Sequence, residues 1–173
     1  MNLKKVFVLV LLFCFSASLS VPANDQKEPI NWRKFIEFFP DIPGWDKVGD
    51  VIGSMISSTI KLSQAEQNYV AGEKKIKILF FDSVGDPMLL SPIKGMLATE
   101  VDTNTQYIRK FEVGGHPGAV LYDFNSKGAQ IVVLIAFRFY LHITGENIEE
   151  QAVNDVKAIT KLIDIAGIAE LGK

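Results

Sequence analysis

Cysteine is almost absent from this chain of 173 residues, and histidine is scarce. The single cysteine, Cys14, lies inside an apolar run near the N-terminus and does not follow the small residues of a lipid-attachment site. Disulfide bonds, thiolate metal sites and a cysteine nucleophile are therefore excluded for the chain beyond that run. Only His116 and His142 supply imidazole groups, so acid-base and metal chemistry have few candidates and the fold depends on packing.

The N-terminus has the three parts of a secretory signal peptide. Lys4 and Lys5 precede ten apolar residues at 6–15, and small residues follow them. A membrane-spanning helix needs about 20 apolar residues, so we predict a signal peptide over 1–23, export to the periplasm or the medium, and no permanent membrane span after cleavage. Cleavage is expected after Ala23 or after Ser20, and an uncleaved anchor is the alternative.

Beyond the predicted cut, the chain has the size of one domain. Residues 24–30 form a short polar tether, and residues 31–173 contain no repeat, low-complexity tract or second long apolar run. About 150 residues suffice to bury a core without cross-links. The mature chain keeps 16 basic residues against 20 acidic ones and has no basic cluster. We therefore expect no nucleic-acid partner, since phosphate binding requires basic patches.

Alternating apolar residues predict an antiparallel sheet. Residues 75–82 are apolar on both faces, which indicates a central strand, and 105–113 and 119–124 continue as a meander through glycine-rich turns. Every odd position from 129 to 143 is apolar. Fifteen residues at ~3.3 Å each would span about 50 Å, too long for this domain. Residues 129–143 are therefore one bent strand or a hairpin, with the reversal expected at 136–138.

Three segments show the spacing of helices. Residues 31–39 place apolar side chains on one face and end at Pro40, and a short helix is expected to begin near Ser91. The last helix is expected to begin at Asn147, with Glu150 completing a capping box and apolar residues at 148, 152, 153, 156, 159, 163 and 166. Residues 45–54 are irregular or stranded, and 55–70 are predicted to be stranded.

No residue set forms a catalytic, cofactor-binding or metal-binding signature. Ser83 follows a central strand and has His116 as a possible base, but no G-x-S-x-G surrounds it. The favoured interpretation is that Asp82 and Ser83 bind backbone amides of a turn. We interpret His142 as a satisfied surface or cross-strand histidine. Glycine and carboxylate spacings match neither dinucleotide nor Ca²⁺ or Zn²⁺ motifs.

An aromatic group near the N-terminus allows two interpretations, a core face or a docking surface. Its members are Trp32, Phe35, Phe38, Phe39 and Trp45. Large apolar side chains at helical spacing are usually buried. We therefore predict a core face for this group.

Several short motifs together resemble a group of uncharacterised exported bacterial proteins. The motifs lie at 42–45, 63–69, 76–83, 115–118 and 137–139 and in a last helix reaching 163–164. Those proteins look like relatives of the PsbP-like α/β/α sandwich. The resemblance implies an α+β fold, an antiparallel sheet flanked by helices, in the cell envelope. It carries no catalytic residues, and PsbP-type domains act as accessory subunits.

These observations predict a non-catalytic binding or accessory module of the cell envelope that docks on an envelope protein and needs no cofactor. The alternative is a carrier of a small apolar ligand held between sheet and helices, because several strands are apolar on both faces. A hydrolase that uses Ser83 with His116 is the third hypothesis.

Overall fold

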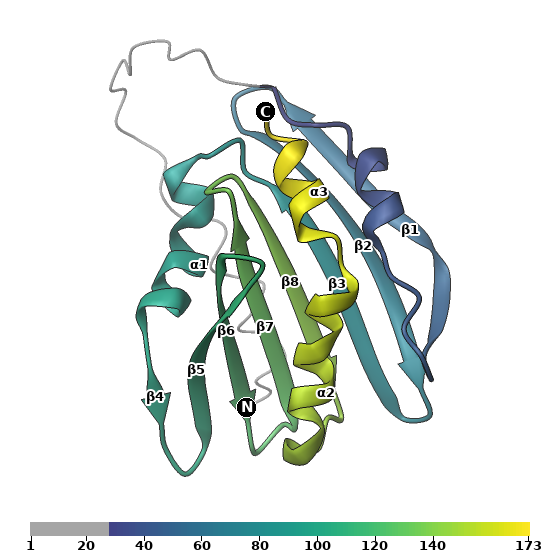
Figure 1. The fold of residues 1–173 in the computed structure, drawn as a ribbon, viewed down its shortest axis with the longest axis vertical. Coiled ribbons are helices and arrows are strands. Elements are labelled where there is room, and N and C mark those ends of the chain that lie inside the picture. The colour runs from purple at the N-terminus through teal and green to yellow at the C-terminus, as the bar shows by residue number, and fades with distance from the viewer. Residues whose placement is uncertain (1–27) are drawn as a thin grey trace, which may run out of the picture.

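The computed structural model describes residues 28–173, and its main feature is one antiparallel sheet (Figure 1). The predicted signal peptide, both cleavage positions and residues 24–27 of the tether lie outside the described residues. Neighbouring strands are all antiparallel, in the order β1-β2-β3-β8-β7-β6-β5-β4. The strands are β1 (Asp46–Ser57), β2 (Lys61–Ala71), β3 (Lys74–Asp82), β4 (Val101–Asp102), β5 (Gln106–Val113), β6 (His116–Asp123), β7 (Gly128–Ile135) and β8 (Phe139–Glu146).

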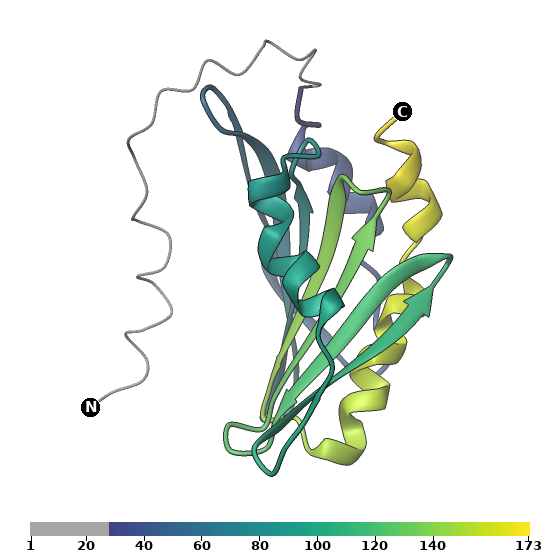
Figure 2. The same cartoon turned by 90° about the vertical axis from the view of Figure 1, so that its left-hand side faces the viewer.

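The two faces of the sheet differ in what covers them (Figure 2). One face, here the covered face, carries the 3-10 helices η2 (Trp32–Phe38), η3 (Glu150–Ala152) and η4 (Ile159–Leu162) and the α-helices α2 (Val153–Ala158) and α3 (Ile165–Glu170). On the opposite face, here the open face, α1 (Pro87–Ala98) packs over β6 and β7. In the described part of the chain, no helix is long and apolar enough to cross a bilayer.

The predicted α+β fold, with helices flanking the sheet as in a PsbP-like sandwich, is wrong. Strands hold 45% of the described residues and helices 26%, so the molecule is mainly a single sheet with a few short helices. The open face of β2 and β3 presents charged side chains such as Glu66 and Lys77. A helix packs on an apolar layer, and this part of the sheet does not provide one.

The core lies between the sheet and the helices of the covered face. Phe80 of β3 stacks on Phe35, with ring centroids 5.6 Å apart, and its centroid is 4.8 Å from that of Phe39. Phe35 also meets the ring of Phe139 edge-on. The prediction that the N-terminal aromatic group belongs to the core is confirmed, because Phe35 and Phe39 are buried and the partly buried Trp32, Phe38 and Trp45 pack against the core of the covered face.

The single C-terminal helix expected from Asn147 is wrong. Asn147 has a left-handed backbone, with φ +57, and its side chain donates to the carbonyl of Glu73, so it does not cap a helix. The segment instead contains η3, α2 and η4, and the chain begins a new helix after Asp164, whose carboxylate accepts from the amide of Gly167. This restart buries Ile165 and Ile168, and position 166 is exposed.

The start of α1 also differs from the prediction. The helix begins at Pro87, because Asp86 caps it by accepting from the amide of Met88 at 2.8 Å. Proline fits the first helical turn, where no intrahelical donor is needed. Pro92 lies inside the helix, at the position that suggested a later start.

The hairpin interpretation of residues 129–143 is confirmed. β7 and β8 pair directly, and the reversal uses Ala136 and Phe137, with φ +50 and +54. The amide of Arg138 donates to the carbonyl of Ile135 at 3.1 Å and closes the turn. Three residues, 136–138, connect the paired Ile135 and Phe139, and the two positive φ values lie at positions that glycine or asparagine normally occupies.

Replacing Phe137 with glycine is expected to raise the free energy of unfolding by roughly 0.5–1 kcal/mol. A non-glycine residue in the left-handed conformation costs about 1–2 kcal/mol, and glycine removes this cost. Part of the gain is lost again, because glycine also gives the unfolded chain more conformational freedom. Because Phe137 is 73% exposed, little packing is lost. Urea unfolding measures the effect. Phe137→Ala keeps the Cβ atom and is the control, so an equal gain in that variant would contradict relief of strain.

Candidate functional site

Ser83 and His116 do not meet in the structure. Ser83 is buried at the end of β3, where its hydroxyl donates to the carbonyl of Arg138 at 2.6 Å and accepts from the amide of Gly85. His116 begins β6, and β8 and β7 lie between β3 and β6. Three strand spacings amount to about 14 Å. The arrangement does not bring this hydroxyl and imidazole within reach of one another.

Asp82 forms a buried two-point ion pair with Arg138 on the covered face. Nε of Arg138 is 2.8 Å from Oδ1 of Asp82, and Nη2 is 2.7 Å from Oδ2. The same carboxylate accepts from the amides of Val84 and Ile30, both at 2.9 Å. Nη2 of Arg138 also donates to the carbonyl of Glu28. The prediction that Asp82 and Ser83 bind backbone amides of a turn is confirmed.

This ion pair was missed by sequence reasoning, although one signal for it was present. Arg138 is the last residue of the expected reversal at 136–138, and the register places its neighbour Phe139 opposite Asp82. The hairpin therefore brings an arginine to the end of the central strand. Since protein groups fill the bonding positions of the carboxylate, the cluster holds the N-terminal segment rather than a substrate.

His142 is not the fully hydrogen-bonded histidine that we predicted. It lies on β8 between Leu79 of β3 and Val132 of β7, facing the open face. Its Nε2 is shielded and has no hydrogen-bond partner within residues 28–173. Burial, together with the charge of Lys77, lowers the pKa of His142 to about 4. The neutral imidazole therefore acts as part of the packed sheet.

This lowered pKa predicts a loss of stability in mild acid. The unfolded chain, with an ordinary pKa of about 6.5, binds a proton between pH 6.5 and 4 while folded His142 does not. The contribution of His142 to the free energy of unfolding is therefore fully present above about pH 6.5. It is lost as the pH drops toward 4, by roughly 3 kcal/mol in total. Unfolding by urea at several pH values should show a flatter slope in this window for His142→Leu. Equal slopes for both proteins would contradict the assignment.

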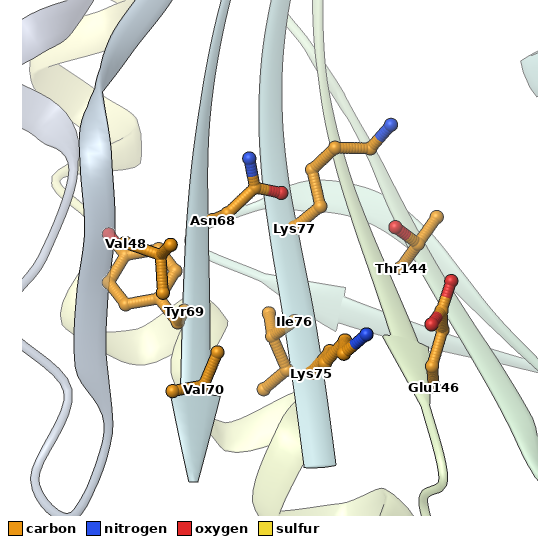
Figure 3. A pocket seen from close by; sticks show the side chains of 9 residues that line it. All are labelled: Val48, Asn68, Tyr69, Val70, Lys75, Ile76, Lys77, Thr144 and Glu146. Carbon is orange, nitrogen blue, oxygen red and sulfur yellow. The ribbon is translucent and has the colours of Figure 1, made fainter. Parts of the chain in front are cut away.

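A hollow of about 420 Å³ lies on the open face (Figure 3). Its lining comes from β1, β2, β3 and β8 and combines apolar Val48, Val70 and Ile76 with charged Lys75 and Lys77. The hollow is therefore of mixed character and open to solvent, and it is not the apolar space between sheet and helices that the carrier hypothesis requires. Nor do residues 28–173 contain a group of three or more metal-ligating side chains placed to hold an ion.

The most unusual surface is the free edge formed by β1, at the right of Figure 1. Its twelve residues pair on one side only, with β2. Five large apolar side chains are exposed along the strand and in the following turn: Val48, Ile52, Met55, Ile56 and Ile60. Ile52 is the most exposed of them, at 63%. From residue 51 to residue 60 the chain has no charged side chain.

The opposite edge of the sheet is protected. β4 has only two residues, and Asp102 within it pairs with Arg109 at 3.4 Å. Short edge strands, charges and bulges are the usual means by which proteins prevent pairing with other chains. β1 has an irregularity between Val48 and Ile52, which includes Gly49 at φ +67. Beyond it, the uncharged half of β1 has none of these protections.

Contacts with η2 hold this half of β1 in place. A Cβ atom at Gly53 would overlap the ring of Trp32, so the indole lies flat against the strand backbone on the covered face. Sequence reasoning placed strand-like residues at 45–54 and 55–70 but missed the hairpin turn at 58–60, inside the second segment, because residues 57–60 contain no glycine, asparagine or proline. The ten-residue run without charge was the available signal for an unprotected edge.

The β1 edge therefore offers unpaired backbone groups flanked by apolar side chains, a surface that suits the addition of another strand. Comparisons of this chain with protein-family models, curated proteins and solved structures gave no match.

Proposed function

We propose that the mature chain is an exported, non-catalytic binding module of the cell envelope, which binds protein by pairing a β-strand with its β1 edge. The observation that carries this proposal is the uncharged half of β1, where backbone groups and apolar side chains are exposed together. Proteins protect such edges unless pairing is useful, since an unprotected edge causes aggregation. The opposite edge of the same sheet, formed by β4, is protected, so the lack of protection is specific to β1.

The polar clusters support binding over catalysis. The hydroxyl of Ser83 forms hydrogen bonds with main-chain atoms of its own chain, and Asp82 and Arg138 form an ion pair with each other. The imidazole of His142 is packed between strands. None of these groups is presented to a substrate with a second catalytic group beside it.

Retention of envelope proteins by the purified, processed protein tests this proposal. The Ile52→Lys variant adds a charge to the edge and is expected to lose the retained protein, because a lysine on an edge strand opposes pairing. Met88→Lys is the matched control, since Met88 is 80% exposed and lies on α1, away from β1. Equal retention by wild type and both variants would contradict a role for the β1 edge.

A further inference from the structure

We infer that the strand which pairs with β1 is β1 of a second copy of this chain, so that two sheets join antiparallel across a twofold axis. The inference rests on the proposed function and names its partner. It follows from three properties of the two sheet edges: their lengths, their charges and the shape of β1.

The lengths of the edges decide which pairings are open to two copies. A β1 edge placed against the other edge would meet the two residues of β4 beside an Asp102–Arg109 ion pair, or the part of β5 beyond β4, which carries the charged Lys110 and Glu112. That head-to-tail contact would be short, and its repetition would form an open chain of molecules. Two β1 edges instead use the same surface twice, so the pairing closes at two copies and leaves only the protected β4 edges outside.

Charge decides the direction of pairing. β1 begins with Asp46, Lys47 and Asp50, and the next charged residue after the uncharged run is Lys61, which is ion-paired with Glu28. Antiparallel pairing about Ser54 places Asp50 of one copy opposite the uncharged Ser58 of the other. Parallel pairing in register would place each Asp50 beside its own counterpart, and like charges at an interface cost several kcal/mol. Where the uncharged runs of the two copies lie opposite one another, no charged side chain faces another.

The shape of β1 allows a ladder of useful length. Beyond the irregularity, Ile52 to Ser57 pair in unbroken register with β2. Six residues extend about 20 Å. Gly53 faces Trp32 on the covered face, and alternation along the strand therefore places Ile52 and Ile56 on the open face. A twofold axis at Ser54 would place Ile52 of one copy opposite Ile56 of the other on the open face, so that the isoleucines of both copies form one apolar strip.

Disulfide trapping tests the inference directly. In a Cys14→Ser background, Ser54→Cys provides a single thiol near the proposed axis. Disulfide formation requires Cα atoms within about 7 Å. We expect mild oxidation to link most of the Ser54→Cys protein as a dimer, whereas Asp102→Cys on the β4 edge should link only slowly.

Sedimentation equilibrium of the processed protein provides the second measurement. We expect a reversible dimer whose dissociation constant rises about a hundredfold in Ile52→Lys, roughly tenfold for the change in each copy, and less than about twofold in Met88→Lys. A wild-type protein that stays monomeric, or a Ser54→Cys protein that links no faster than Asp102→Cys, overturns the inference.

The two proposals fail in different ways. If the purified protein is monomeric but still retains an envelope protein in a manner lost in Ile52→Lys, the inference falls and the proposed function stands. If neither self-association nor retention depends on Ile52, both fall.

Discussion

Replacing Arg138 with methionine is expected to lower the free energy of unfolding by about 3–5 kcal/mol, because Asp82 then remains buried without its counter-charge. The side chain of Asp82 is fully buried, and that of Arg138 nearly so. Removal of the guanidinium also frees the carbonyl of Glu28 from its donor. A loss of this size is a large fraction of the stability of a domain of this length. Urea or thermal unfolding of the purified variant measures it.

The same substitution in an exposed ion pair is the control for this prediction. Arg109 pairs with Asp102 at the sheet edge, where both side chains are largely exposed. Exposed pairs contribute about 0–1 kcal/mol, so Arg109→Met is expected to have a small effect. Equal losses in the two variants would show that burial of the Asp82–Arg138 pair has no special effect.

The Phe80→Ala variant is expected to lose about 3–5 kcal/mol, since truncation of a buried phenylalanine removes apolar burial and leaves a cavity. Phe80 is 1% exposed and contacts both Phe35 and Phe39. The cavity would therefore open beneath η2. Hydrogen exchange is expected to accelerate in η2 before it does so in β7 and β8.

Phe137→Ala is the matched control for Phe80→Ala, because it removes the same atoms from an exposed position. We expect its stability to change by less than about 0.5 kcal/mol. If Phe80→Ala unfolds at the same denaturant concentration as wild type, the aromatic cluster does not hold η2 on the sheet.

The elements that the sequence predicts well are those whose side chains alternate between two environments. The alternation over 129–143 predicts the strand residues of the β7–β8 hairpin, and their length requires a bend or a reversal, although it does not choose between the two. The core role of Phe35 and Phe39 follows similarly from their spacing. In each case local pattern and tertiary environment agree, as expected where burial dominates the choice of structure.

The elements that the sequence does not predict depend on single side-chain contacts. Asn147 has the residue type of a helix cap, but its amide bonds to Glu73, which is 74 residues earlier in the chain. Asp164 starts a helix that the apolar stripe alone would run through. The predicted arrangement of layers was wrong for a similar reason. Apolar residues on both faces of β3 suggested that helices cover both faces, whereas Lys75 and Lys77 keep part of its open face exposed.

The candidate site was hidden for a different reason. Exposure of β1 depends on strand order, and strand order depends on β8 pairing with β3 across a long connection. No local pattern shows that β1 is left at the edge. The lack of charge from 51 to 60 shows which half of that edge is unprotected, but only after its place in the sheet is known.

The bonds of Glu28 and Ile30 have a consequence for the order of folding. They join these residues to Arg138 and Asp82, which lie 110 and 52 positions later in the chain. Apart from the ion pair of Glu28 with Lys61, 33 positions later, these bonds form only after Asp82 and then Arg138 have been synthesised. Closure of so long a loop comes late, because its entropy must be lost before the contacts form. We therefore expect the bonds that tie residues 28 and 30 to the buried Asp82–Arg138 pair to be among the last native contacts to form during folding.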